Sequence, residues 1–191
     1  MPRIELITSK DQIPADRHAE YDAIVDVLGR VGGPFGVLMH SPGLAEKVCK
    51  AGAQVRLGSE LTMAERELAL LSTAREKDAV YEWSTHAPIA RDHGVRDEAI
   101  TAIRNGAETG GLEADERDII EYVRELLRTN RVSQDRFDAL RERHGVRWLV
   151  ELTGTVGQYQ YIAAINNAFE LEPRPGGEVL PVPARAEAEV A

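Results

Sequence analysis

Apolar residues recur every three or four positions along most of this chain, and this spacing restricts its fold more than any other feature. It places side chains on one face of a helix, where they can pack against a neighbouring element. Runs that alternate apolar and polar residues, as a half-buried strand requires, are nearly absent, while Ala, Leu, Glu and Arg dominate. The sequence therefore predicts an all-α fold.

Breakers and capping residues divide this pattern into segments. Residues 32–34, Gly-Gly-Pro, interrupt the chain, and residues 62–65, Thr-Met-Ala-Glu, form a capping-box pattern at a helix start. The predicted helices cover approximately residues 16–29, 41–58, 62–77, 79–94, 97–105, 114–130, 133–144 and 146–169.

The length of 191 residues suits a single medium-sized domain. We assign residues 1–171 to the helical domain. From Glu172 onward the chain is rich in Pro, Gly, Ala and Glu, a composition that cannot bury a core. Residues 172–191 are therefore expected to be a flexible tail, disordered or draped over a neighbour.

The charge balance restricts the partners. The net charge is −9, from 23 basic and 32 acidic residues, which argues against nucleic acid and against an anionic membrane surface. No apolar run has the length of a membrane span, and the first ten residues lack the apolar core of a signal peptide. A cytoplasmic protein that acts on a small molecule is the expectation.

Cys49 is the only cysteine in the chain. An intrachain disulfide, a CxxC redox pair and a cysteine zinc cluster are therefore excluded. We expect Cys49 to be a small core residue.

Three ionisable side chains lie on otherwise apolar helix faces. Glu82 and His86 are four residues apart, so they share a face of one predicted helix, and Glu67 lies within the apolar stripe of the preceding helix. Ionisable groups that point into a core cost free energy unless they are paired or used. Two consecutive helices with a short connection pack their apolar faces together, so Glu67 and His86 are expected within hydrogen-bonding reach.

These residues admit three interpretations. Glu67, Glu82 and His86 could form a proton relay, because an imidazole can accept and return a proton near neutral pH. They could equally be a structural pair that joins two helices. A metal site with His93 would need further ligands, and the spacing is not that of HExxH or of di-iron bundles. We therefore predict no metal and no cofactor.

The last predicted helix contains Gly154 and Gly157, which are unfavourable in an exposed helix. They are expected to permit close packing against another helix or another subunit.

Residues 61–106 resemble the carboxymuconolactone decarboxylase family, which also contains the alkylhydroperoxidase D-type proteins. The resemblance is carried by the acidic residue after Arg66, the Tyr-Glu-Trp at 81–83, His86 four residues past Glu82, and the Gly-Val turn at 94–95. The matching segment reads LTMAERELALLSTAREKDAVYEWSTHAPIARDHGVRDEAITAIRNG.

The resemblance implies an all-helical protein that forms trimers or hexamers with sites at or near subunit contacts. In the peroxidase branch a Glu, a CxxC pair and a His form a proton relay. The Glu corresponds to Glu67 and the His to His86, but the two cysteine positions fall on Ala79 and Glu82. Thiol-based peroxide reduction is therefore not expected, and the decarboxylase branch, which lacks the cysteine pair, is the better match.

The predicted function is that of a cofactor-free carboxy-lyase of this family. It would act on a small carboxylated lactone or a related intermediate of aromatic catabolism. His86 would be the general acid–base, Glu67 its relay partner, and Glu82 would tune His86 or contact substrate. Arg66, Arg75 and Arg91 lie near the motif and are candidates for binding a substrate carboxylate. The alternatives are a non-enzymatic oligomeric binding module on the same scaffold and a metal-dependent enzyme.

Overall fold

The computed structural model describes residues 1–182, which contain helices and no β-strand. The all-α prediction is confirmed. Two short 3-10 helices, η1 (Lys10–Gln12) and η2 (Ala15–Arg17), come before the α-helices. The α-helices are α1 (His18–Leu28), α2 (Pro34–Leu38), α3 (Pro42–Leu57), α4 (Met63–Glu76), α5 (Val80–Asp92), α6 (Asp97–Asn105), α7 (Ala114–Thr129) and α8 (Gln134–Ala168).

The short helix α2 was not predicted. Gly33 has φ 55° and ψ −132°, a backbone conformation that favours glycine, and Pro34 occupies the first helical position. The Gly-Gly-Pro segment therefore breaks one helix and also begins another.

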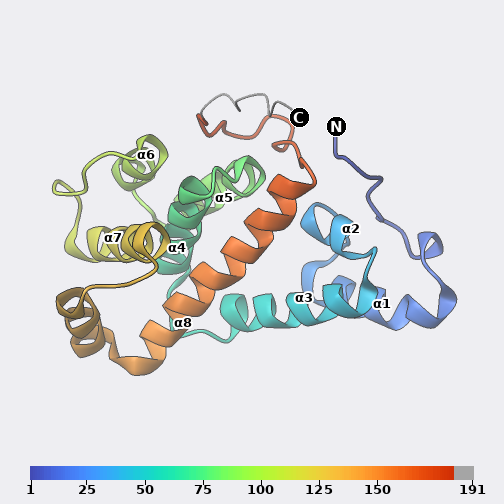
Figure 1. Ribbon diagram of the computed structural model, residues 1–191, viewed down its shortest axis with the longest axis horizontal. Helices are drawn as coiled ribbons and strands as arrows, with labels where there is room; N and C mark the ends of the chain where they lie inside the picture. Colours follow the sequence, from blue (N-terminus) through green and yellow to red (C-terminus); the bar gives the residue numbers. More distant parts are fainter. Residues whose placement is uncertain (183–191) are drawn as a thin grey trace, which may run out of the picture.

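The predicted break near residue 145 is present within α8. Gly145 has φ 86° and ψ 168°, so the helical hydrogen bonding continues across a kink at this one residue. Beyond the kink, α8 runs diagonally through the molecule, with α4 to α7 on one side and α1 to α3 on the other (Figure 1).

Two hydrophobic cores lie on these two sides of α8. The larger core is built from α4 to α8, with Leu70 and Trp83 fully buried in it. The smaller core joins α1, α2 and α3, around Ile24 and Met39, to Ile162 of α8. Because α8 packs into both cores, it forms a common floor where the two groups of helices meet.

The C-terminal segment differs from the expectation of a flexible tail. Residues 172–182 form no helix or strand, but they lie against α4 and α5. The backbone N–H of Arg174 donates to Oγ of Ser84 at 2.9 Å, Glu178 pairs with Arg91 at 2.8 Å, and Leu180 is 1% exposed. Burial of Leu180 in the larger core explains this order. Residues 183–191 of the predicted tail lie outside the described residues.

The glycines of α8 do not pack closely within the chain. A Cβ atom added at Gly154 or Gly157 would meet nothing within 4 Å, and both positions are exposed. Close packing within the chain was therefore the wrong alternative, and packing against a second subunit stays a prediction.

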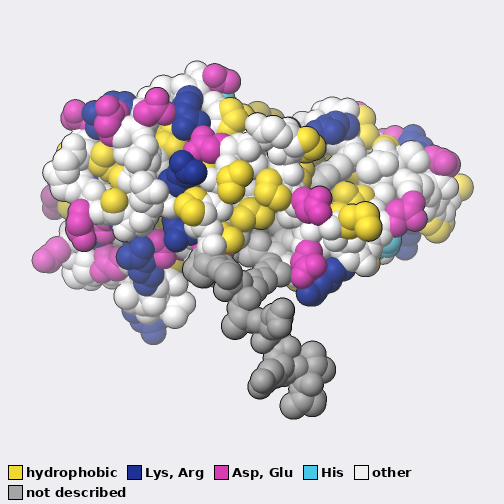
Figure 2. Space-filling view, turned by 90° about the horizontal axis from the view of Figure 1, so that it is seen from above, with side chains coloured by type: hydrophobic (Ala, Val, Ile, Leu, Met, Phe, Trp, Pro, Cys, Tyr) yellow, Lys and Arg dark blue, Asp and Glu magenta, His cyan; other side chains and the backbone are white. Residues whose placement is uncertain are grey.

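The surface is mixed in charge. Figure 2, seen from above Figure 1, shows acidic and basic side chains spread over this face, with a few apolar side chains near its centre. Among residues 1–182, no helix combines the length and the hydropathy needed to cross a membrane.

Candidate functional site

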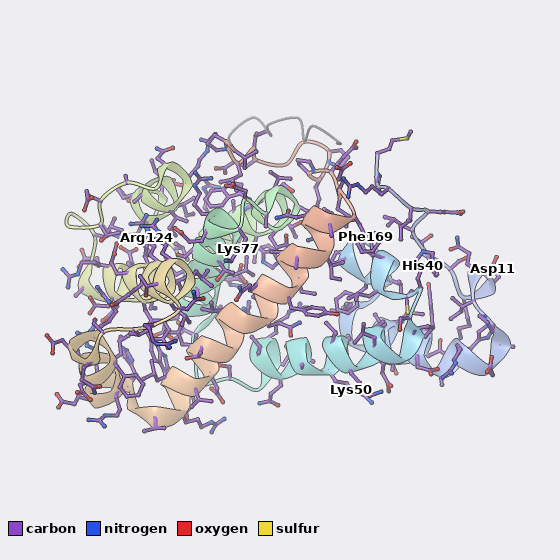
Figure 3. The ribbon with its side chains drawn as sticks, in the orientation of Figure 1. Asp11, His40, Lys50, Lys77, Arg124 and Phe169 are labelled. Atoms are coloured by element: carbon purple, nitrogen blue, oxygen red, sulfur yellow. The ribbon has the colours of Figure 1, made fainter. Side chains whose placement is uncertain are left out.

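A cavity of about 300 Å³ lies where the two groups of helices meet. Side chains of α1, α2 and α3 line one side, α5 lines the other, and α8 provides the floor. Figure 3 shows side chains from α8 and from the α1 to α3 unit meeting between the two ribbons. The volume is at the lower end of the range for small-molecule sites.

Glu67 is held at the start of α4. The predicted capping box is formed, with the Glu65 N–H donating to Oγ1 of Thr62 at 3.2 Å and the Thr62 N–H donating to the Glu65 carboxylate at 2.7 Å. This cap sets the first turn of the helix, so Glu67 points into the protein with 1% of its side chain exposed.

Arg66 neutralises one oxygen of Glu67. Its Nη2 donates to Oε1 of Glu67 at 2.9 Å, and its Nη1 donates to the backbone carbonyl of Arg56 at 2.9 Å. Arg66 is itself buried, at 5% exposed. The pair thus fixes Glu67 from one side and links α4 to the end of α3.

His86 takes the other oxygen of Glu67. Its Nδ1 lies 2.8 Å from Oε2 of Glu67, which is the expected contact between the two helices. The ring also packs edge-to-face against Tyr159 of α8, with 5.7 Å between the ring centroids. Since Glu67 occupies Nδ1, Nε2 is the free ring nitrogen of a side chain that lines the cavity.

The charge state of Glu67 follows from its partners. Burial alone raises the pKa of this carboxyl, but the hydrogen bonds and charges of His86 and Arg66 outweigh burial, and the net pKa is lowered. Glu67 is therefore a carboxylate that orients the His86 ring through its contact with Nδ1.

Glu82 differs from Glu67, because no cationic side chain in the described part of the protein pairs with it. Nδ2 of Asn166 on α8 donates to Oε1 of Glu82, while Oε2 is buried without a partner among the described residues. Burial raises the pKa of Glu82 to about 7, although the Asn166 bond acts in the opposite direction. Glu82 lines the cavity one turn before His86. The two acids of the site thus differ in protonation.

Tyr159 adds a hydroxyl group to the cavity. Burial, together with the nearby charge of Glu67, raises its pKa to about 12, so the hydroxyl stays protonated. It can donate a hydrogen bond to a ligand.

The three predicted site residues come together as expected, with Glu82 and His86 on the cavity wall and Glu67 behind His86. The predicted arginines do not line the cavity. Arg66 binds Glu67, Arg75 pairs with Asp78, and Arg91 pairs with Asp97 and Glu178. Because each of these arginines is held by a nearby carboxylate, its side chain is not available to the cavity.

Several polar residues of the site were missed. Among them are Arg30, Arg56 and Arg174, which line the cavity, and Asn166, which binds Glu82. Asn166 offered one signal, because an amide within an apolar helix segment needs a partner. The arginines offered none.

No three His, Cys, Asp or Glu side chains within residues 1–182 are grouped so that they could hold a metal ion. His93 instead occupies the C-cap position of α5.

Comparison with known family models gives one match, which covers less than half of the chain. Residues 42–125 match the model of the carboxymuconolactone decarboxylase family, which confirms the resemblance seen in the sequence. No curated protein matches the chain.

Several solved structures share the fold. An alkylhydroperoxidase AhpD core protein, an uncharacterized peroxidase-related protein from Ralstonia eutropha JMP134, is 17% identical with a TM-score of 0.74, over 92% of this chain and 93% of that chain. An uncharacterized peroxidase-related protein from Silicibacter sp. TM1040 is 14% identical with a TM-score of 0.71, over 92% and 95%. The debrominase Bmp8 in complex with 2,3,4-tribromopyrrole is 14% identical with a TM-score of 0.69, over 90% and 93%. At these identities the likeness shows the fold alone.

Proposed function

Since residues 42–125 match the model of the carboxymuconolactone decarboxylase family, we propose that the chain is a cofactor-free carboxy-lyase acting on a small carboxylated lactone or a related intermediate of aromatic catabolism. His86 is the proposed proton donor and acceptor, Glu67 its orienting partner, and Glu82 a second acid in the same cavity.

The observation that carries this proposal is the chain of contacts from Arg66 through Glu67 to His86 at the cavity wall. Arg66 keeps Glu67 ionised, Glu67 holds Nδ1 of His86, and Nε2 is left for substrate. A carboxylate that fixes the tautomer and orientation of an imidazole is a recurrent arrangement in general acid–base catalysis.

The chemistry needs one proton delivered to carbon. In the decarboxylation, the bond between the ring carbon and the carboxylate breaks, CO2 leaves, and the electron pair passes into the conjugated lactone carbonyl. The proton on Nε2 of His86 then adds to carbon and completes the product. His86 then takes a proton from solvent, and Glu67 keeps the ring oriented through Nδ1 during the cycle.

Glu82 contributes as a neutral acid. When protonated, its carboxyl can donate a hydrogen bond to the lactone oxygen that gains negative charge as CO2 leaves. Donors that point at developing charge in a cavity shielded from water contribute strongly to catalysis.

Thiol chemistry is not part of this proposal. Reduction of a peroxide by a cysteine pair needs two thiols, and Cys49 is the only one in the chain. The names of the peroxidase-related proteins therefore do not extend to this chain.

The test is to assay the purified protein for CO2 release from carboxylated lactones. His86→Gln should abolish turnover, because the amide keeps the volume and hydrogen bonding but cannot carry a proton. His93→Gln is the matched control, since His93 is exposed at the end of the same helix. Full activity in His86→Gln would show that the pair is structural and would favour the non-enzymatic binding module.

A further inference from the structure

We propose that Arg30, Arg56 and Arg174 form a binding site for a carboxylate of the ligand at the cavity. This inference rests on the proposed function for its substrate, a small organic acid, and it assigns the anion-binding groups to residues outside the catalytic motif.

The first observation is that these three guanidinium groups have no acidic partner within residues 1–182. Most arginines in the described part of the chain form ion pairs, as Arg96 does with Glu116 and Arg128 with Glu76. Arg30, Arg56 and Arg174 form none there, although the chain carries 32 acidic residues and a net charge of −9. Three unpaired cations around one cavity of an acidic protein mark a place where an anion can bind.

The second observation is that, within residues 1–182, the lining of the cavity contains a single acidic residue. That residue is Glu82, and burial raises its pKa to about 7, which lowers the fraction that carries a charge. Its Oε1 is also engaged by Asn166. The arginines are therefore free to bind an incoming acid, and the planar guanidinium matches a carboxylate with two parallel hydrogen bonds.

The third observation is the anchoring of Arg174. Its backbone N–H donates to Oγ of Ser84 on α5, and Gly177 lies so close to Ser84 that an added Cβ would be 2.8 Å from the Ser84 Cβ atom. Glu178 and Leu180 fix the chain beyond it. The C-terminal segment thus holds Arg174 at the cavity.

The origin of the three residues points to specificity rather than catalysis. Arg30 follows α1 and Arg174 follows α8, and both lie outside residues 42–125 that match the family. Two of the three anion-binding residues therefore come from segments outside the range that matches the family. Arg56, near the end of α3, links the proposed anion site to the catalytic residues. Its backbone carbonyl accepts a hydrogen bond from Arg66, which in turn pairs with Glu67.

The experiment measures binding of succinate by calorimetry, with neutral succinamide as the comparison. The wild type should bind succinate and not succinamide. Each of Arg30→Gln, Arg56→Gln and Arg174→Gln should weaken succinate binding by roughly tenfold, and the triple variant should lose it. Arg131→Gln is the matched control, because Arg131 is exposed, unpaired with any acid in the described residues, and remote from the cavity lining.

Equal affinity of the wild type and the triple variant, or no succinate binding by the wild type, would overturn the proposal. Circular dichroism of the triple variant checks that the helices persist. The result is separate from the fate of the lyase activity. Succinate binding without turnover of any lactone would support the anion site and contradict the lyase activity. Lactone turnover with an unchanged KM in the triple variant would support the lyase activity and contradict the anion site.

Discussion

Asn166 donates one hydrogen bond to Glu82, and each of the two side chains keeps a buried oxygen that has no partner within residues 1–182. Oε2 of Glu82 and Oδ1 of Asn166 are both acceptors, so neither can satisfy the other while Glu82 is ionised. A proton on Oε2 turns one of these acceptors into a donor. The pair therefore favours a neutral Glu82, in agreement with the effect of burial on its pKa.

Glu82→Gln should make the stability less dependent on pH. The folded pKa of Glu82, about 7, lies above its ordinary value of 4.5. Glu82 therefore adds on the order of 3 kcal/mol to the free energy of unfolding below pH 4.5, and this contribution is lost as the pH rises through 7. The variant stays neutral and can donate to Asn166, so urea unfolding should show it gaining stability relative to the wild type between pH 5 and pH 8. Glu108→Gln, at an exposed position, should keep the wild-type dependence.

Arg66→Gln should weaken both the fold and the orientation of Glu67. The variant leaves a buried carboxylate with one cationic partner fewer, which costs about 3 kcal/mol. The lowered pKa of Glu67 gives stability that is present above pH 4.5 and lost as the pH falls through the folded pKa. Removing Arg66 raises that pKa, so acid unfolding should begin at a higher pH.

Acid titrations followed by circular dichroism measure this shift. Arg141→Gln removes a surface pair with Asp138 and should cost less than about 1 kcal/mol. An unchanged acid transition in Arg66→Gln would contradict the assigned role.

Contacts between consecutive helices were predictable, and contacts between distant segments were not. The capping box at Thr62 and the apolar faces of two neighbouring helices were sufficient to place Glu67 beside His86, and the bounds of α4 and α5 agree with prediction within two residues. The reason is that a short connection leaves two amphipathic helices few ways to pack.

The cationic part of the cavity depends on three segments that are far apart in sequence. Arg30, Arg56 and Arg174 meet only because α8 brings the α1 to α3 unit and the C-terminal segment to α5. The composition of residues 172–182 indicated a tail, and only the tertiary structure shows the burial of Leu180 that orders it. Helical periodicity contains no information on such long-range placement.

Gly33→Ala should be more destabilising than Gly29→Ala. Both glycines have positive φ, at 55° and 75°, so each substitution strains the backbone by about 1–3 kcal/mol, and the ψ of −132° at Gly33 puts its cost at the upper end. An added Cβ at Gly29 meets nothing, whereas at Gly33 it would lie 2.1 Å from the Tyr81 hydroxyl at the cavity wall. Thermal unfolding should show the larger loss for Gly33→Ala, and Tyr81→Ala in the same chain should recover part of it. Equal losses would mean that Tyr81 moves aside freely.

Cys49→Ala should leave any activity nearly intact, even though Cys49 lines the cavity. Burial raises the pKa of this thiol, and the charge of Arg56 offsets only part of that effect, so the reactive thiolate is disfavoured. The expected kcat is within about twofold of wild type, with a stability loss of about 1 kcal/mol. Loss of turnover with an unchanged fold would show that the chemistry is thiol-dependent.

Val150→Arg should disrupt the assembly of the protein. On α8, the exposed residues Val146, Val150, Gly154, Gly157 and Tyr161 recur at helical spacing and form one stripe, with Val146 and Val150 64% and 63% exposed. The glycines leave room for a helix of a second subunit to approach closely.

Light scattering should show a trimer or hexamer for the wild type and smaller species for the variant, because an unpaired charge in a subunit contact is unfavourable. Val179→Arg controls for added charge, since Val179 is 61% exposed on the C-terminal segment, away from this stripe. A wild type that stays monomeric at about micromolar concentration would show instead that the stripe faces solvent and that the cavity is complete within one chain.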